Sequence, residues 1–408
     1  MEKKKKPAIR FKGFTDSWEQ RKLGDMASSF EYGLNAAAKA YDGENKYIRI
    51  TDIDDNTHKF LTDSLTSPDI DLTGADNYKL TEGDILFART GASVGKSYIY
   101  RNSDGLVYYA GFLIRARINE EYDKEFVFQN TLTDRYNKYI AVTSQRSGQP
   151  GVNAQEYAEF EINVPKKEEQ TKIGTYFRNL DHLITLHQRK YDKLQIIKKS
   201  MLEKMFPQSG SCFPEIRFKG FTDSWEQRKL GDVAEYRNGQ GHEDKQSDYG
   251  KYELVNLNSI SIDGGLKPSG RFVDEAQDTL LKDDLVMVLS DVGHGDLLGR
   301  VALIPENNRF VLNQRVALLR VTDNTDVRFL FSIINANQRY FKREGAGSSQ
   351  LNISRDSVEN FIVDSPTVDE QKKIGTYFDT LDHLITLHQR EVEKLQNIKK
   401  SMLETMFV

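Results

Sequence analysis

Two glycine-rich segments come close to nucleotide-binding loops, but neither has the spacing that phosphate binding requires. Residues 91–97 read GASVGKS, and the Gly-x4-Gly-Lys-Ser pattern would need its first glycine at position 90, which is Thr90. Residues 293–299 read GHGDLLG, one residue too many for the Gly-x-Gly-x-x-Gly fingerprint. Each segment is followed by residues typical of a strand rather than of the required helix. We therefore interpret both as tight turns between strands.

Groups that could process a nucleic acid are also missing. The sequence has no Pro-Pro dipeptide, which excludes the Asn/Asp-Pro-Pro-aromatic clamp of an amino-methyltransferase. Residues 44–46 (ENK) and 243–245 (EDK) match only half of a nuclease Glu-x-Lys signature, because no Pro-Asp precedes either at a suitable spacing. We therefore predict no catalytic residues and a binding protein rather than an enzyme.

Metal binding and membrane insertion are disfavoured as well. The histidine pairs 182/187 and 383/388 are five residues apart on predicted helices, which puts the two rings about 140° apart around the axis. The single cysteine, Cys212, can form neither an internal disulfide nor a cysteine-rich zinc site. No run of about 18 apolar residues is present, and no apolar segment follows the basic start MEKKKKPAIR. We expect no metal and a location in the reducing cytoplasm.

Length and charge limit the possible architectures. A chain of 408 residues suggests two or three domains. Its net charge of −4, with 29% charged and 11% aromatic residues, describes an ordinary globular protein rather than a polycation. An anionic partner would have to be held by local basic patches.

An internal repeat organises the sequence. Residues 7–25 (PAIRFKGFTDSWEQRKLGD) recur as residues 214–232 with one substitution, and residues 170–206 recur as 371–407 with eight substitutions in 37 positions. The segments between these blocks, 26–169 and 233–370, resemble each other only faintly. The chain therefore consists of two copies of a short block, a variable domain and a long helix.

The longer blocks have the periodicity of long amphipathic helices, with apolar residues at a spacing of three or four. About 30 residues at 1.5 Å each give a helix of about 45–50 Å. We expect the two helices to pair in antiparallel fashion, which would relate the copies by a pseudo-two-fold axis; the alternative is that each helix packs only on its own domain. The residues predicted to bind partners along these helices are Leu180, Ile184, Tyr191, Leu194, Leu381, Ile385, Val392 and Leu395.

The variable domains have mixed, strand-rich patterns. Predicted strands are residues 46–50, 84–88, 97–100, 285–289, 300–304 and 314–321, and predicted helices are 124–139 and 327–341. The expected fold class is α+β, with two mixed strand-rich domains separated by a pair of long antiparallel coiled-coil helices. The expected boundaries are 1–169 for the first block and domain, 170–206 for the first helix, 207–213 for a linker, 214–370 for the second block and domain, and 371–408 for the second helix.

Such a duplicated scaffold suits a protein that meets one kind of partner twice and two different targets once each. A spacing of about 45–50 Å is roughly 1.3–1.5 turns of DNA, so both domains could read one duplex at separated half-sites.

The sequence resembles the specificity subunits of type I restriction-modification enzymes. The resemblance rests on RFKGFTDSWEQRKLGD, LDHLITLHQRKYDKLQ, the segment from Gly83 to Lys96 and the segment from Gln149 to Gly174. It implies a non-catalytic subunit that binds a bipartite, asymmetric site in double-stranded DNA. It also implies two methyltransferase subunits on the repeated helices, joined by restriction and translocase subunits. S-adenosylmethionine, ATP and Mg would then belong to those partners, with no cofactor in this chain.

The residue types that can read bases lie on loops of both variable domains. Arg and Lys donate to guanine, amides pair with adenine, and Ser and Thr contact either. The DNA-binding candidates of the first domain are Arg89, Thr90, Ser93, Lys96, Arg146, Ser147, Gln149 and Asn153. Those of the second domain are Gln240, His242, Lys245, Ser290, His294, Lys342, Arg343, Ser348, Ser349, Gln350 and Asn352.

The negative net charge of both variable domains is also compatible with functions other than DNA recognition. Residues 26–169 and residues 233–370 each carry −7, so we expect weak DNA binding by this chain alone, with much of the grip on DNA supplied by the partners. One alternative is a structural adaptor whose two domains bind proteins, which the acidic domains favour. A second is a fused enzyme with its own nuclease or methyltransferase activity.

Overall fold

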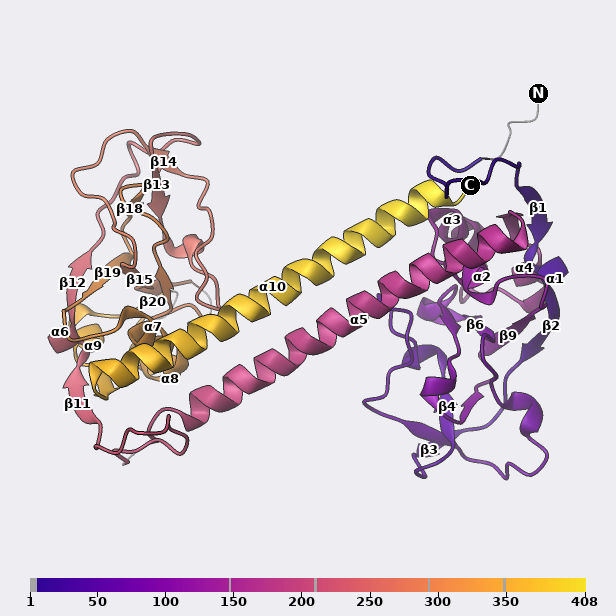
Figure 1. Ribbon diagram of the computed structural model, residues 1–408, viewed down its shortest axis with the longest axis horizontal. Helices are drawn as coiled ribbons and strands as arrows, with labels where there is room; N and C mark the ends of the chain where they lie inside the picture. Colours follow the sequence, from indigo (N-terminus) through magenta and orange to yellow (C-terminus); the bar gives the residue numbers. More distant parts are fainter. Residues whose placement is uncertain (1–5, 147, 209–210, 293, 348–349) are drawn as a thin grey trace. The chain divides into compact units, whose positions relative to one another are not determined.

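The computed structural model describes residues 6–146, 148–208, 211–292, 294–347 and 350–408. It has an α+β architecture (Figure 1). The chain forms two compact units: the first runs up to Gln188 and includes Arg390–Val408, and the second is Arg189–Gln389. We call residues 26–169 the first domain and residues 233–370 the second domain.

The first unit is built around a four-stranded antiparallel sheet in the order β2-β9-β6-β7. A parallel pair, β4-β8, and two antiparallel pairs, β3-β5 and β1-β10, flank this sheet. Its strands are β1 (Glu19–Lys22), β2 (Ala27–Tyr32), β3 (Ala38–Ala40), β4 (Lys46–Ile48), β5 (Thr66–Pro68), β6 (Ile85–Ala88), β7 (Ser97–Ile99), β8 (Val107–Tyr109), β9 (Leu113–Ile118) and β10 (Glu161–Val164). Its helices are α1 (Leu23–Met26), α2 (Lys124–Asn130), α3 (Asp134–Thr143), α4 (Ala154–Ala158) and the start of α5 (Lys167–Lys204).

The second unit repeats this plan, although the sequence of its domain, residues 233–370, differs from that of the first. Its antiparallel sheet has the order β12-β19-β15-β17, and a parallel pair, β13-β18, again lies beside it. Its strands are β11 (Glu226–Lys229), β12 (Ala234–Asn238), β13 (Tyr252–Val255), β14 (Phe272–Val273), β15 (Leu285–Val288), β16 (Ser290–Asp291), β17 (Val301–Leu303), β18 (Phe310–Leu312), β19 (Val316–Val321), β20 (Leu351–Asn352) and β21 (Ile362–Ser365). Its helices are α6 (Leu230–Val233), α7 (Val327–Ala336), α8 (Gln338–Glu344), α9 (Arg355–Glu359) and the start of α10 (Val368–Met406). These elements confirm the predicted fold class.

Both helices predicted inside the domains are broken in two. The first divides between α2 and α3, where Thr133 caps α3 by accepting a hydrogen bond from the backbone N–H of Tyr136. The second divides at Asn337, whose φ of −101° and ψ of 34° are not helical. Short polar side chains offer the backbone local partners that end a helix, and apolar periodicity alone does not reveal such breaks.

The two long helices run antiparallel in each unit. In the first unit, Lys399 on α10 pairs with Asp181 on α5 at 2.7 Å, and Phe407 lies 5.5 Å from Phe177 between ring centroids. In the second unit, Lys198 on α5 pairs with Asp382 on α10, and the Phe206 ring lies 5.8 Å from that of Phe378. Residue numbers rise along one helix as they fall along the other, which confirms the expected antiparallel pairing.

The end of each long helix is part of the other copy's hydrophobic core. Met406 from α10 is 4% exposed in the cluster formed by Trp18 and Phe126, and Met205 from α5 is 4% exposed in the cluster formed by Trp225 and Phe329. The alternative in which each helix packs only on its own domain is therefore wrong. Each long helix has apolar residues at both ends that must be buried away from water. One domain buries those at its start, and the other domain buries those at its end.

A buried ion pair joins each short repeated block to the start of the following helix. Arg10 Nε and Nη2 donate to the two carboxylate oxygens of Glu169 at 2.6 and 2.7 Å, and the Glu169 side chain is 1% exposed. Arg217 and Glu370 form the same bidentate pair at 2.7 Å for both bonds. The hydrogen bond and charge of Glu169 raise the pKa of Arg10, which keeps its guanidinium protonated at neutral pH.

The first turn of each long helix also forms hydrogen bonds with its domain. Gln170 accepts a hydrogen bond from the backbone N–H of Asp123 at 3.0 Å, and Asp123 caps α2 through Phe126 at 2.9 Å. Gly174 leaves space for this cap, since a Cβ there would lie 2.3 Å from Asp123 Oδ1. Gln371, Asp326 and Gly375 repeat the arrangement.

We expect Glu169→Gln to destabilise the protein by roughly 3 kcal/mol, because it leaves the Arg10 guanidinium, whose side chain is only 13% exposed, without a counter-charge. Calorimetric unfolding of the full chain measures this change. Glu159→Gln is the control: Glu159 pairs with Lys22, both about half exposed, and loss of this solvent-screened pair should leave the stability nearly unchanged. Equal effects of the two substitutions would contradict the role of the buried pair.

Gly174→Ala should lower the midpoint of thermal unfolding, although alanine favours helix over glycine by about 1 kcal/mol elsewhere. The added methyl group would displace the Asp123 cap. Circular dichroism melting of this variant and of Ser401→Ala, an exposed position on α10, compares the two cases. The idea fails if Gly174→Ala is as stable as Ser401→Ala.

Candidate nucleic-acid interface

In the first domain, a cationic and aromatic surface forms where three strands of the main sheet end. The Arg89 guanidinium lies over the Tyr32 ring, 4.9 Å from its centroid. The backbone N–H of Arg89 donates to the carbonyl of Phe112 at 3.0 Å. Tyr32 is 43% exposed and Phe112 is 60% exposed, so two aromatic rings and a cation face solvent together.

The segment 149–153 is tied to the same surface. Thr90 forms a β-bridge with Gly151, and the backbone N–H of Val152 donates to the carbonyl of Arg89 at 2.9 Å. The fold thus brings together four of the predicted residues: Arg89, Thr90, Gln149 and Asn153. We call the surface formed by Tyr32, residues 89–90, Phe112 and residues 149–153 the first edge.

Other predicted residues of the first domain have partners within the domain. Lys96 is paired with Asp55 at 2.6 Å and its side chain is only 17% exposed. Arg146 pairs with Glu156 and donates to the carbonyls of Thr143 and Gln145. Ser93 lies half-buried in a one-turn helix, Gly91–Ser93, and Ser147 lies outside the described residues.

In the second domain, the corresponding surface is held by a serine and amide network. Ser290 is 1% exposed and donates to Asn352 Oδ1 at 2.8 Å, across the β16-β20 pair. Gln350 Nε2 donates in turn to Ser290 Oγ. Ser290 therefore orients Gln350 and Asn352 instead of facing solvent itself.

The loop 240–245 lies against the turn before β19. Gln240 forms a β-bridge with Asn313, and Gln314 Nε2 donates to Glu243. His242 Nδ1 is 2.9 Å from the Gln240 carbonyl, and the exposed Lys245 donates its backbone N–H to the His242 carbonyl at 3.0 Å. We call the surface formed by residues 240–245, 290–291, 313–315, 350 and 352 the second edge.

Three further candidates of the second domain, Lys342, Arg343 and His294, lie outside the second edge. Lys342 pairs with Asp296 at 2.9 Å, and the hydrogen bond from Lys342 lowers the pKa of Asp296. Arg343 is exposed over the Tyr340 ring, and His294 is exposed. Ser348 and Ser349 lie outside the described residues.

Tyr32, Phe112 and Arg315 were not among the residues predicted from the sequence. A strand was predicted over 314–321, but β19 begins at Val316 and Arg315 lies in a turn with a positive φ of 68°. The signal was present: the polar run Asn-Gln-Arg separates two apolar strands, FVL and VALLRV. Exposed aromatic residues at strand ends have no comparable signal in a single sequence.

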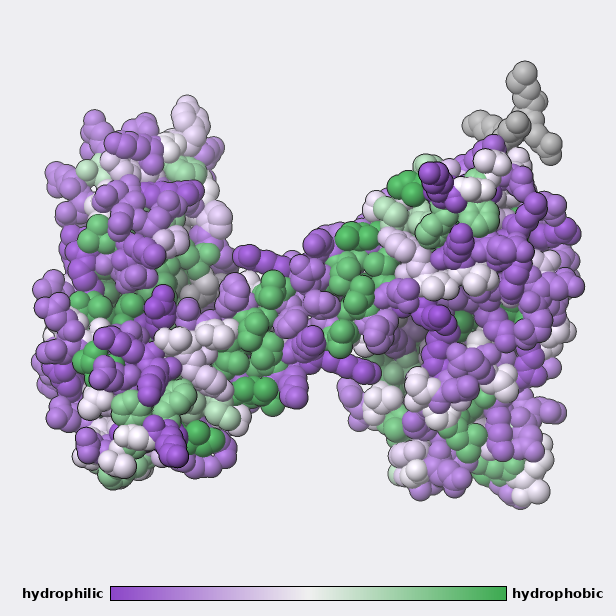
Figure 2. All heavy atoms as spheres, viewed as in Figure 1, coloured by the Kyte–Doolittle hydropathy of each residue, from purple (hydrophilic) through white to green (hydrophobic). Residues whose placement is uncertain are grey.

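The residues predicted to bind partners are mostly covered by other parts of the chain. Leu180, Leu381, Ile385 and Val392 are 7–8% exposed, and Ile184, Tyr191, Leu194 and Leu395 are half-buried. The strongly exposed apolar side chains of the two helices are neighbours of this stripe: Leu183, Leu186, Ile196 and Leu387. In Figure 2, hydrophobic residues lie along the visible surface of both long helices, whereas the domains are mostly hydrophilic.

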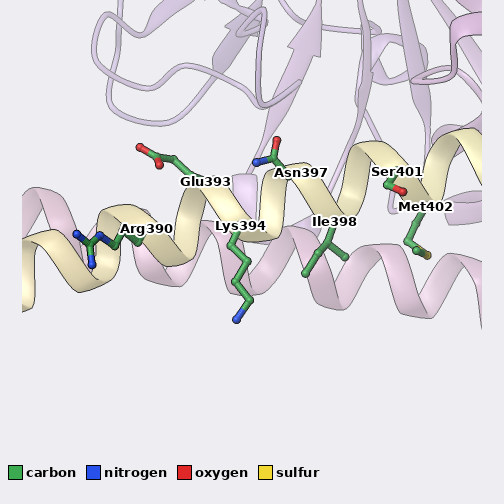
Figure 3. Close-up of a pocket in the computed structure, with 7 residues that line it drawn as sticks. All are labelled: Arg390, Glu393, Lys394, Asn397, Ile398, Ser401 and Met402. Atoms are coloured by element: carbon green, nitrogen blue, oxygen red, sulfur yellow. The ribbon is translucent and has the colours of Figure 1, made fainter. Parts of the chain in front are cut away.

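A shallow hollow follows α10 within the first unit (Figure 3). Ile398 and Met402 point toward α5 and join the core of the unit, whereas Glu393 and Asn397 point away from α5. Its lining is completed by Arg390, Lys394 and Ser401. Within the part of the chain that is described, no group of three His, Cys, Asp or Glu side chains is arranged to hold a metal ion, and no helix is long and apolar enough to cross a membrane.

Comparisons with known proteins agree with these features. The family model of the type I restriction modification DNA specificity domain matches twice, over residues 15–195 and 222–397. Two Methanocaldococcus jannaschii proteins named as type I restriction enzyme specificity subunits are similar. MjaX is 24% identical and MjaVIII 20% identical; each match covers 96% of this chain, with 93% and 92% of the relatives covered.

A solved structure has the same fold. The S subunit of a type I restriction-modification system from M. genitalium aligns with a TM-score of 0.66 at 15% identity, over 99% of both chains. The two matches of the family model cover most of the sequence and coincide with the two copies of the repeat. The chain therefore belongs to the family of type I restriction-modification DNA specificity proteins, and it is a target-recognition subunit rather than an enzyme.

Proposed function

We propose that the two domains read the two halves of a bipartite, asymmetric sequence in double-stranded DNA, each through its own edge. One observation carries this proposal: the two edges lie at the same place in one repeated fold but carry different side chains. The first offers Arg89, Tyr32 and Phe112, and the second offers Gln350, Asn352 and Arg315. Guanidinium and amide groups are the donors that distinguish base edges.

The charge of the domains explains why partners would be needed for tight binding. Each domain carries −7, and basic side chains such as Lys96, Arg146 and Lys342 are already paired with carboxylates. Phosphate contacts supply much of the affinity for DNA, and an acidic domain supplies few of them. We therefore propose that this chain selects the DNA sequence and that associated subunits supply most of the phosphate contacts.

We propose that the near-identical long helices receive two methyltransferase subunits, with restriction subunits completing the assembly in the cytoplasm. The buried apolar stripe is occupied by the helix pair itself, so each unit offers its own exposed apolar residues to a partner: Leu183 and Leu186 in the first, and Ile196 and Leu387 in the second. S-adenosylmethionine, ATP and Mg would bind to those partners.

Exchanging residues 26–169 for the corresponding domain of another specificity protein should change one half of the methylated motif. The second half should stay the same, because the second domain is unaltered. Mapping methylated positions in the genome of cells that express the chimera with its methyltransferase measures both halves. A protein-binding adaptor would be indicated if neither half changed, and a shared reading surface if both changed.

Arg89→Ala should weaken binding of the methyltransferase complex to its target by roughly 10- to 100-fold, as expected for one lost bidentate base contact. Titration of labelled duplex at fixed salt measures the change. Arg21→Ala is the matched control, since Arg21 is exposed and pairs with Glu19 on β1, outside the first edge. Equal binding by the Arg89 and Arg21 variants would remove Arg89 from the interface.

A further inference from the structure

The turn before β9 in the first domain and the turn before β19 in the second occupy the same position in the fold. Gly33 donates its N–H to the Leu113 carbonyl at 3.1 Å, and Gly239 donates to Val316 at 3.0 Å. The Phe112 carbonyl accepts from Arg89 at 3.0 Å, and the Arg315 carbonyl accepts from Leu289 at 2.9 Å. Phe112 and Arg315 are therefore equivalent residues, although no sequence similarity marks them.

The backbone at this turn is held in the same way in both domains. Ala110 donates its N–H to Ile48 and Asn313 donates to Val255, each at 3.0 Å. A Cβ on Gly33 would lie 2.2 Å from the Ala110 carbonyl oxygen, and one on Gly239 would lie 1.9 Å from that of Asn313. Only glycine permits this close approach, so the main chain is fixed while the side chains of the turn are free to differ.

The side chains of the two turns have opposite chemistry. In the first domain the turn is Ala110-Gly111-Phe112, and the Phe112 ring is 60% exposed. In the second domain it is Asn313-Gln314-Arg315, beside the short helix η5 (Leu257–Ser259). The hollow at this place has a volume of about 340 Å³ and is lined by Glu243, residues 256–258 and residues 313–315.

Two donors in this hollow are available to a ligand. Gln314 is engaged by Glu243, and Asn256 Oδ1 accepts the backbone N–H of Asn258 at 2.9 Å. In contrast, the Arg315 guanidinium and the Asn258 side-chain amide are both exposed and have no hydrogen bond or ion pair with any residue that the structure describes. Arg315 also has a φ of 68°, a conformation that strains a residue with a Cβ and that glycine would adopt without strain.

We propose that Arg315, assisted by Asn258, reads a guanine in the half-site of the second domain, while Phe112 makes an apolar contact at the equivalent position of the first domain. This inference rests on the proposed function. It identifies the equivalent positions, Phe112 and Arg315, at which the two domains would recognise different bases. A guanidinium pairs with the N7 and O6 acceptors of guanine, whereas a phenyl ring has no donor and contacts a thymine methyl group or a base face.

The test uses the full chain assembled with its methyltransferase and a library of duplexes randomised in both half-sites. Arg315→Ala should relax the requirement at one guanine of one half-site, with a 10- to 100-fold loss on the original site and an unchanged second half-site. Arg315→Gly should give the same relaxation without loss of thermal stability, because glycine tolerates the positive φ. Asn258→Ala should relax the same position or its immediate neighbour.

Arg309→Ala is the control, since Arg309 is 56% exposed, pairs with Glu306 and lies outside the second edge. The inference is overturned if Arg315→Ala leaves the selected motif unchanged. It is also overturned if binding weakens equally for all sequences, which would identify a phosphate contact. Failure of the wild-type complex to select any two-part motif would instead refute the proposed function.

Discussion

The rest of the structure depends on the joint between each domain and the long helix that follows it. A buried guanidinium-carboxylate pair and a glycine pressed against a helix cap fix the angle at which the helix leaves the domain. A charge in this environment is tolerated only with its partner, so Arg10 and Glu169 must be retained together. The same holds for Arg217 and Glu370. This mutual dependence gives a physical reason for the near-identity of the duplicated blocks, because each residue of the joint has its partner in another part of the repeat.

The edges of the two domains differ from the joints, because their side chains are not the same in the two copies. Glycines at positions 33 and 239 allow the close main-chain approach that gives the turn the same shape in both domains, whereas Phe112 and Arg315 at its end expose their side chains to solvent. Recognition can then change from aromatic to hydrogen-bonding chemistry without refolding the domain. A rigid backbone with exchangeable side chains is how one fold can serve two different targets.

Much of the architecture could be predicted from the sequence because its signals are long and repeated. The antiparallel helices follow from apolar residues at helical spacing over 37 positions present twice. Short-range features were less accessible. Lys96 is of the right type for a phosphate contact but pairs with Asp55. Arg315 was assigned to a strand although it belongs to the polar run Asn-Gln-Arg that separates β18 from β19. The eight residues of the apolar helical stripe were predicted to bind partners, and the structure shows four of them buried in the chain itself.

The first unit is assembled from two distant stretches of sequence, whereas the second is one continuous stretch. The ribosome therefore synthesises all of Arg189–Gln389 before Met406 and Phe407, which fill the core around Phe126 and Phe177. Domains usually fold in the order of synthesis. Here the first unit can complete its core only after the whole second unit has been synthesised, because Met406 and Phe407 belong to that core.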